Sequence, residues 1–181
     1  TTPDKPAGRG QKLHRSDVKL AALELGLPVL QPEKLKAPEF VAAMQALRPD
    51  LGIVIAFRML PEVIWAMPRL GTFNLHASLL PQYRGAAPIQ WTVLNGDAIA
   101  GVTTMFMGEG LDTGDMLLKA ETPVGENETS GELFERLCHL GADLLIDTIE
   151  ALKDETITPI PQNEEEASYA SMLSKKDSLI D

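Results

Sequence analysis

Hydrophobic and polar positions alternate along the chain with two different periods, which predict a succession of helices and strands. The run LGIVIAF over residues 51–57 is continuously apolar and rich in β-branched residues, which is typical of a buried strand. TFNLH at 72–76 alternates with period two, as a strand does. Apolar residues recur with helical spacing over 130–152, which predicts a long amphipathic helix with Ser130 near its N-cap.

Turn and capping residues delimit further elements. Ser16 is predicted to cap a helix that Gly26 ends. Residues 1–12 have no hydrophobic period and are rich in Pro, Gly and charge, which predicts a loop. The remaining predicted helices lie at 40–48, 61–67 and 87–96, and the remaining strands at 27–32, 101–107 and 115–122, the last two paired across 108–114. The tail from about Pro159 is polar and resembles a linker.

The order of these elements predicts an α/β domain with a largely parallel sheet, because strands alternate with helices along the chain. A complete open α/β domain usually begins with a hydrophobic strand, whereas this chain begins in a polar loop. We therefore expect the chain to be a fragment of a larger domain.

Composition and charge narrow the class of protein. The chain has 181 residues, of which 44% are hydrophobic, and this is an ordinary globular composition. Its net charge of −10 argues against general affinity for nucleic acid. Residues 1–19 are locally basic, however, and a basic loop can still contact phosphates. The apolar runs are too short to cross a bilayer, so no membrane partner is expected.

Cysteine and histidine usage limits the chemistry. Cys138 is the only cysteine, which excludes an internal disulfide and a cysteine-based zinc site and favours a reducing cytoplasm. His14, His76 and His139 lack metal-ligand spacing, so we expect no metal.

The segment NLHASLLPQYRGAAPIQ at 74–90 carries the strongest candidate chemistry. Asn74 and His76 lie two apart in a predicted strand, and this spacing puts both side chains on the same face. The loop that follows leaves the carboxyl end of the strand, where α/β sheets bind ligands. Asp112, in the turn GEGLDTGD, is expected to return a carboxylate to the same place. A convergent amide, imidazole and carboxylate can polarise a carbonyl and move a proton.

Each of these residues also has a purely structural interpretation. A histidine at a strand end is more often only hydrogen-bonded there, and Asn and Asp both favour turns. The combination of Asn74, His76 and Asp112 favours the functional interpretation over these alternatives.

The segments FNLHASLLPQYRG and GLDTGDML resemble the two signature stretches of the folate-dependent formyltransferases. TTPDKPAGRGQKL, RGAAPIQ and SYASMLSKKDSLID extend the resemblance over essentially the whole chain, toward the members that act on initiator tRNA. The resemblance implies a Rossmann-like α/β formyltransferase domain followed by a small β-barrel domain. By this resemblance, the first strand, first helix and second strand of that domain, and the barrel, would be missing from the given sequence. Residues 1–158 would be the catalytic domain, and residues 159–181 its end and a linker toward the absent domain.

The resemblance also implies roles for individual residues. Asn74 and protonated His76 would hydrogen-bond the formyl oxygen and stabilise the tetrahedral oxyanion, while Asp112 would keep His76 protonated. The tetrahydrofolate site would be lined by Ser78, Leu79, Leu80 and Pro81. The pterin ring would be received by the backbone of Ala56, Phe57, Arg58 and Met59, where many family members carry Tyr-Gly in place of Phe57-Arg58. Arg9 would contact the acceptor end of the tRNA, and Arg84 has either a functional role or a structural one in the loop.

The implied activity is transfer of a formyl group from 10-formyltetrahydrofolate to the methionine α-amino group of initiator Met-tRNA. We expect no covalent enzyme intermediate, and a cytoplasmic monomer. One alternative is a formyltransferase that acts on an amino sugar nucleotide or on glycinamide ribonucleotide. Another is an inactive folate-binding domain, which the intact Asn74, His76 and Asp112 disfavour.

Overall fold

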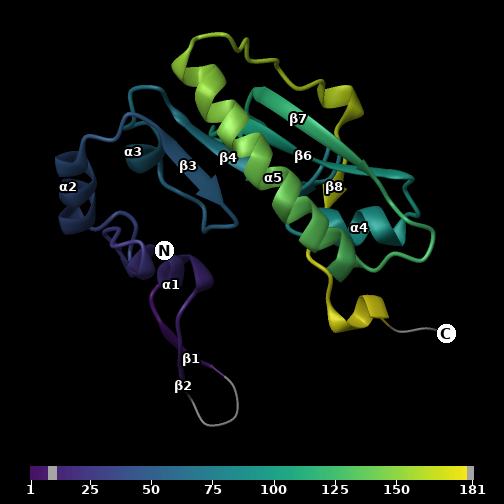
Figure 1. The fold of residues 1–181 in the computed structure, drawn as a ribbon, viewed down its shortest axis with the longest axis horizontal. Coiled ribbons are helices and arrows are strands. Elements are labelled where there is room, and N and C mark those ends of the chain that lie inside the picture. Colours follow the sequence, from purple (N-terminus) through teal and green to yellow (C-terminus); the bar gives the residue numbers. More distant parts are fainter. Residues whose placement is uncertain (8–11, 179–181) are drawn as a thin grey trace. The chain divides into compact units, whose positions relative to one another are not determined.

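The computed structural model describes residues 1–7 and 12–178, which form two compact units (Figure 1). The first unit comprises Thr1–Asp50 and Phe57–Arg69, and the second comprises Leu51–Ala56 and Leu70–Asp181. Among the described helices, none has both the length and the apolar character needed to span a bilayer.

The first unit begins with a small β-hairpin rather than the predicted loop. Its elements are β1 (Lys5–Ala7), β2 (Lys12–His14), α1 (Asp17–Glu24), α2 (Pro38–Leu47) and α3 (Glu62–Trp65). β1 and β2 pair antiparallel, and strands of three residues are too short to show a hydrophobic period in the sequence. Arg9, for which a tRNA contact is predicted, lies outside the described residues. Ser16 caps α1 as predicted, because its hydroxyl accepts a hydrogen bond from the Lys19 N–H.

The prediction of a strand at 27–32 is wrong, since this segment forms no strand and pairs with none of the described strands. Pro28 and Pro32 cannot donate hydrogen bonds to a ladder. Side chains hold the segment instead: Gln31 Nε2 donates to the Thr2 carbonyl at 2.7 Å and to Asp4 Oδ1 at 2.8 Å. Hydrogen bonds, first from Lys19 and then from Gln31, lower the pKa of Asp4.

The second unit contains a four-stranded sheet in the order β3-β4-β6-β7. Its strands are β3 (Gly52–Ile55), β4 (Thr72–His76), β6 (Ile99–Phe106) and β7 (Met116–Pro123). β3 and β4 are parallel, whereas β6 pairs antiparallel with both β4 and β7. The predicted α/β class is confirmed, as is the strand pair joined across 108–114. The sheet is mixed: the β3–β4 pair is parallel, and β6 and β7 are added to it with antiparallel pairing.

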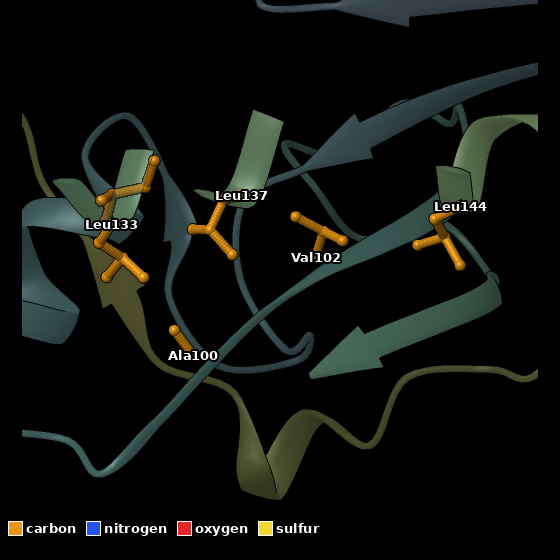
Figure 2. Packing of buried hydrophobic residues seen from close by; sticks show 6 residues of the cluster. Ala100, Val102, Leu133, Leu137 and Leu144 are labelled. Carbon is orange, nitrogen blue, oxygen red and sulfur yellow. The ribbon is translucent and has the colours of Figure 1, made fainter. Parts of the chain in front are cut away.

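One face of this sheet is covered by α5 (Ser130–Lys153), which crosses β6 and β7 (Figure 1). Figure 2 shows the contact: leucines of α5 face small and β-branched residues of β6. The cluster includes Ala100, Val102, Leu133, Leu137 and Leu144. Full burial of each leucine is worth roughly 1.5–3 kcal/mol. Ser130 lies next to the N-cap of α5, as predicted; the N-cap itself is Thr129, which forms a capping box with Glu132.

The C-terminal part of the second unit packs back onto the segment that follows β4. β8 (Tyr169–Ala170) pairs parallel with β5 (Arg84–Gly85), just before α4 (Pro88–Leu94). Gly85 has φ +112°, and a Cβ there would lie 2.8 Å from the Ala170 carbonyl oxygen, so this approach requires glycine. The tail also forms two 3-10 turns, Glu164–Glu166 and Lys175–Ser178. Part of the predicted linker therefore lies against the segment that follows β4, while the predicted domain boundary at 158 stays a prediction.

Candidate active site

β4 presents different side chains to the two faces of the sheet. Leu75 packs against the α5 cluster. Asn74 and His76 alternate with it and occupy the opposite face, opposite Met105 and Thr103 of β6. His76 is buried and Asn74 is half-buried. The common face expected from their spacing is therefore found at the carboxyl end of a strand.

The imidazole of His76 is fixed along one edge by the main chain. Its Nε2 lies 2.8 Å from the carbonyl oxygen of Tyr83, and because a carbonyl only accepts, Nε2 carries the proton and donates it. Its Nδ1 lies 3.7 Å from Asp112 Oδ2. Both side chains are nearly buried, with 7% and 11% of their surface exposed. The other edge of the ring is thus the one that faces a carboxylate.

Asp112 connects His76 to the β5 turn. Its Oδ2 accepts a hydrogen bond from the Gly85 N–H at 2.8 Å. Its backbone is left-handed, with φ +54°, a region that Asp tolerates better than most residues. Asn74 differs from His76 and Asp112, since no described residue makes a hydrogen bond to its side-chain amide.

The loop after β4 is fixed by hydrogen bonds to the buried Thr103 of β6. Thr103 donates its hydroxyl proton to the Ser78 carbonyl at 2.7 Å and accepts a hydrogen bond from the Leu80 N–H at 3.2 Å. Leu80 is fully buried against Met105 and Met116, and Lys119 donates to its carbonyl. A cavity of about 350 Å³ lies beside the loop, lined by polar and apolar side chains that include Ser78, Leu79, Gln82, Tyr83 and Asp97.

Arg84 is fully buried and forms an ion pair with the tail. Its Nη1 and Nη2 donate to the two carboxylate oxygens of Glu164 at 2.9 and 2.8 Å, and its Nε donates to Gln162 Oε1 at 2.9 Å. The hydrogen bonds to Glu164 raise the pKa of Arg84, and those from Arg84 lower the pKa of Glu164. We call Arg84, Gln162 and Glu164 the Arg84 cluster. It shows that Arg84 has a structural role in fixing the loop to the tail.

Tyr83 belongs to the candidate site although the sequence does not reveal it, because it contacts His76 through its main-chain carbonyl. The tail holds its backbone, since its N–H donates to Ser168 Oγ at 2.9 Å. Its hydroxyl donates to Asp97 Oδ2 at 2.6 Å and accepts from Asn95 Nδ2 at 2.8 Å. Burial raises the pKa of Tyr83 above its ordinary value. The positive φ of +57° was also not foreseeable for a tyrosine.

The segment predicted to receive a pterin ring is divided between the two units. Ala56, with φ +45°, follows β3 in the second unit, while Phe57, Arg58 and Met59 belong to the first. Arg58 donates to the carbonyls of Pro32 and Glu33, and its guanidinium lies 5.2 Å from the Phe57 ring centroid. The site described above therefore consists of second-unit residues only.

This arrangement brings an imidazole edge and an amide of β4, the amide unengaged by any described residue, together with a carboxylate from the turn between β6 and β7. A carbonyl oxygen that gains negative charge can be stabilised by the first two groups, and the carboxylate can balance charge on the imidazole. No three His, Cys, Asp or Glu side chains in the described part of the chain come together as a metal site would require.

The fold and the site together define an α/β domain with polar side chains converging at a strand's carboxyl end. The chain belongs to the formyl transferase family, whose model matches residues 1–149.

Similar proteins share both sequence and fold with this chain. It is 54% identical over 164 residues to methionyl-tRNA formyltransferase of Bacteroides fragilis, covering 91% of this chain and 51% of that protein. It is 49% identical over 182 residues to methionyl-tRNA formyltransferase of Alkaliphilus oremlandii, covering 100% and 59%. The chain thus spans between half and three fifths of the length of these relatives.

A solved structure of similar fold is the formyltransferase PseJ from Anoxybacillus kamchatkensis in complex with a formamido sugar nucleotide and tetrahydrofolate. It matches with a TM-score of 0.70 and 25% identity, over 91% of this chain and 86% of that one.

Proposed function

We propose that this chain is the catalytic part of an enzyme that transfers a formyl group from 10-formyltetrahydrofolate to the methionine α-amino group of initiator Met-tRNA. The main support for the proposal is one observation. Asn74 and His76 lie on the same face of β4, and Asp112 Oδ2 lies 3.7 Å from His76 Nδ1. The names of the relatives support the acceptor, and the tetrahydrofolate bound to PseJ supports the co-substrate.

We propose that the Nδ1 edge of the imidazole is the one that acts on the substrate. Because Nε2 already donates to Tyr83, Nδ1 is the ring nitrogen left to interact with a substrate. In the proposed complex, Nδ1–H of His76 and the amide N–H of Asn74 donate to the formyl oxygen. Both donors gain strength as that oxygen becomes negative in the tetrahedral intermediate. Asp112, next to Nδ1, balances the positive charge of the doubly protonated ring.

The proposed reaction consists of one addition and one elimination. The neutral amine of methionine attacks the formyl carbon, a C–N bond forms and the C=O electron pair moves to the oxygen. The intermediate collapses when the bond between the formyl carbon and N10 of the folate breaks. The attacking nitrogen loses one proton and N10 gains one, and we assign this relay to Asp112 acting through water. Its Oδ1 is suited to this role, since Gly85 already occupies Oδ2.

Roles for the remaining predicted residues belong to the same proposal. Folate would contact the loop residues Ser78, Leu79, Leu80 and Pro81, and its pterin ring the backbone of Ala56, Phe57, Arg58 and Met59. Arg9 would contact the tRNA. The cytoplasmic location and the monomeric state stay predictions from the sequence.

The second candidate is formyl transfer to an amino sugar nucleotide, which the sugar nucleotide in the PseJ complex favours. The same three side chains would catalyse it, so the acceptor decides between the two proposals. The test offers the intact protein 10-formyltetrahydrofolate with either Met-tRNA or a UDP-linked amino sugar. Formylation of Met-tRNA alone is expected, and formylation of the sugar alone would refute the leading acceptor. Formylation of neither, by folded protein that binds tetrahydrofolate, would favour the inactive folate-binding alternative.

A further inference from the structure

Asp112 requires external support to hold its carboxylate in place. Its left-handed backbone, with φ +54°, is less favourable than a right-handed one for residues with a side chain, although Asp tolerates it better than most. The turn that carries it is further constrained at Gly114, where a Cβ would overlap the Phe106 carbonyl oxygen. A backbone of this kind persists only where surrounding contacts hold it.

Gln162 provides such contacts from the tail. Its Nε2 donates to the carbonyl of Asp112 at 2.8 Å and to the carbonyl of Gly114 at 2.8 Å. Its Oε1 accepts from Arg84 Nε at 2.9 Å. One amide therefore ties both carbonyls of the Asp112 turn to a buried guanidinium.

The chemistry of this position calls for glutamine. An amide has two N–H donors and one acceptor, and here all three are used. A carboxylate would accept from Arg84 but would face two carbonyls with no proton to donate. The guanidinium itself is held in place by Glu164, which pairs with it through two hydrogen bonds.

We propose that Gln162 is a positioning residue for the Asp112 carboxylate, acting through the two carbonyls of its turn. Gln162 keeps Asp112 Oδ2 between the Gly85 N–H and the His76 ring. It touches no reacting atom in the proposed reaction. The inference rests on the proposed function only where it predicts a loss of activity; the position of the carboxylate can be measured without any substrate.

The test variant is Gln162→Glu in the intact protein. The Gly85 amide proton reports the carboxylate position by NMR, because it donates to Asp112 Oδ2. We expect its chemical shift to move and its hydrogen exchange to accelerate. We also expect kcat per folded molecule to fall about 10–100-fold, with KM for 10-formyltetrahydrofolate little changed, since small misplacements of a catalytic group carry losses of this size.

A matched control separates position from charge. Asn163→Asp adds the same negative charge at the next residue, which is exposed; it retains the acceptor for the Glu165 N–H and loses only the exposed hydrogen bond from Asn163 Nδ2 to Glu166 Oε1. This variant should leave the Gly85 amide and kcat as in the wild type. Should Gln162→Glu not fold, Gln162→Met tests the same role, because it keeps about the length of the side chain and removes both donors, together with the acceptor for Arg84 Nε, without adding charge.

The outcomes are distinguishable. An unchanged Gly85 amide in a folded Gln162 variant would overturn the positioning role, whatever the activity. Equal effects in Asn163→Asp would also overturn it, since charge alone would then be the cause. A displaced Gly85 amide with normal kcat would support the positioning role and refute the catalytic role proposed for Asp112.

Discussion

Asn74→Ala offers the cleanest test of the proposed chemistry, because the structure separates its catalytic effect from its structural one. The Asn74 amide has no hydrogen-bond partner among the described residues and the side chain is only half-buried. Truncation therefore breaks no internal hydrogen bond, and the free energy of unfolding should change by about 0.5 kcal/mol or less. The matched control is Asn127→Ala, at an exposed turn away from β4.

The expected catalytic loss is much larger than the structural one. Removal of one oxyanion donor typically lowers kcat by about 10²–10³, or roughly 2.7–4 kcal/mol in the barrier. The affinity for 10-formyltetrahydrofolate should change little, since the hydrogen bond strengthens mainly in the transition state. Steady-state kinetics of formyl transfer and chemical denaturation of the same samples measure the two quantities separately.

Comparison with His76→Ala sharpens the test. That variant removes the other proposed oxyanion donor and also leaves the Tyr83 carbonyl without its partner, which costs about 1–3 kcal/mol of stability. His76→Ala should thus lose both activity and stability, whereas Asn74→Ala should lose activity alone. Turnover by Asn74→Ala near that of Asn127→Ala would refute the oxyanion role of Asn74.

Three further predictions concern the surroundings of the site. Gly85→Ala should lower both kcat and the denaturation midpoint, because φ +112° and the Ala170 carbonyl leave no room for a methyl group; wild-type values for both would contradict the β5–β8 contact. The ion pair with Arg84 lowers the pKa of Glu164 below its ordinary value of 4.5. The ion pair therefore stabilises the fold fully above pH 4.5, and this stabilisation is lost as the pH falls through the lowered pKa. Glu164→Gln should reduce the loss of stability in acid, as measured by denaturation at several pH values, and an unaltered loss would count against the ion pair. Arg9→Ala should impair formylation of Met-tRNA more at low salt than at high salt while leaving folate affinity nearly intact, and an equal loss with a small acceptor would rule out a tRNA contact.

The elements that the sequence predicts well are those set by local physics. The spacing of Asn74 and His76 determines their common face, because strand geometry repeats every two residues. Ser16 and Gly26 bound α1 for similarly local reasons, one as a capping acceptor and the other with φ +67°. Continuous apolar character likewise located β3 within residues 51–57.

Contacts between distant residues account for what the sequence does not predict. Tyr83 serves His76 through a carbonyl, a group that every residue has, so its identity carries no signal. Gln162 and Glu164 lie in a polar tail whose composition is that of a linker, and only the buried Arg84 gives them a partner. The segment at 27–32 has the apolar character of a strand, but side chains rather than a ladder hold it.

The Arg84 cluster has a consequence for the order in which a functional molecule can arise during synthesis. Arg84 and Glu164 are 80 positions apart, and the ribosome adds residues from the N-terminus onward. His76 and Asp112 are therefore made well before Gln162, which holds the Asp112 turn. A nascent chain that ends before residue 162 contains all three proposed catalytic side chains but lacks the contacts that fix one of them. With Gln162 in the proposed positioning role, the Asp112 turn is held only once the tail has left the ribosome and folded back onto the residues that were made first.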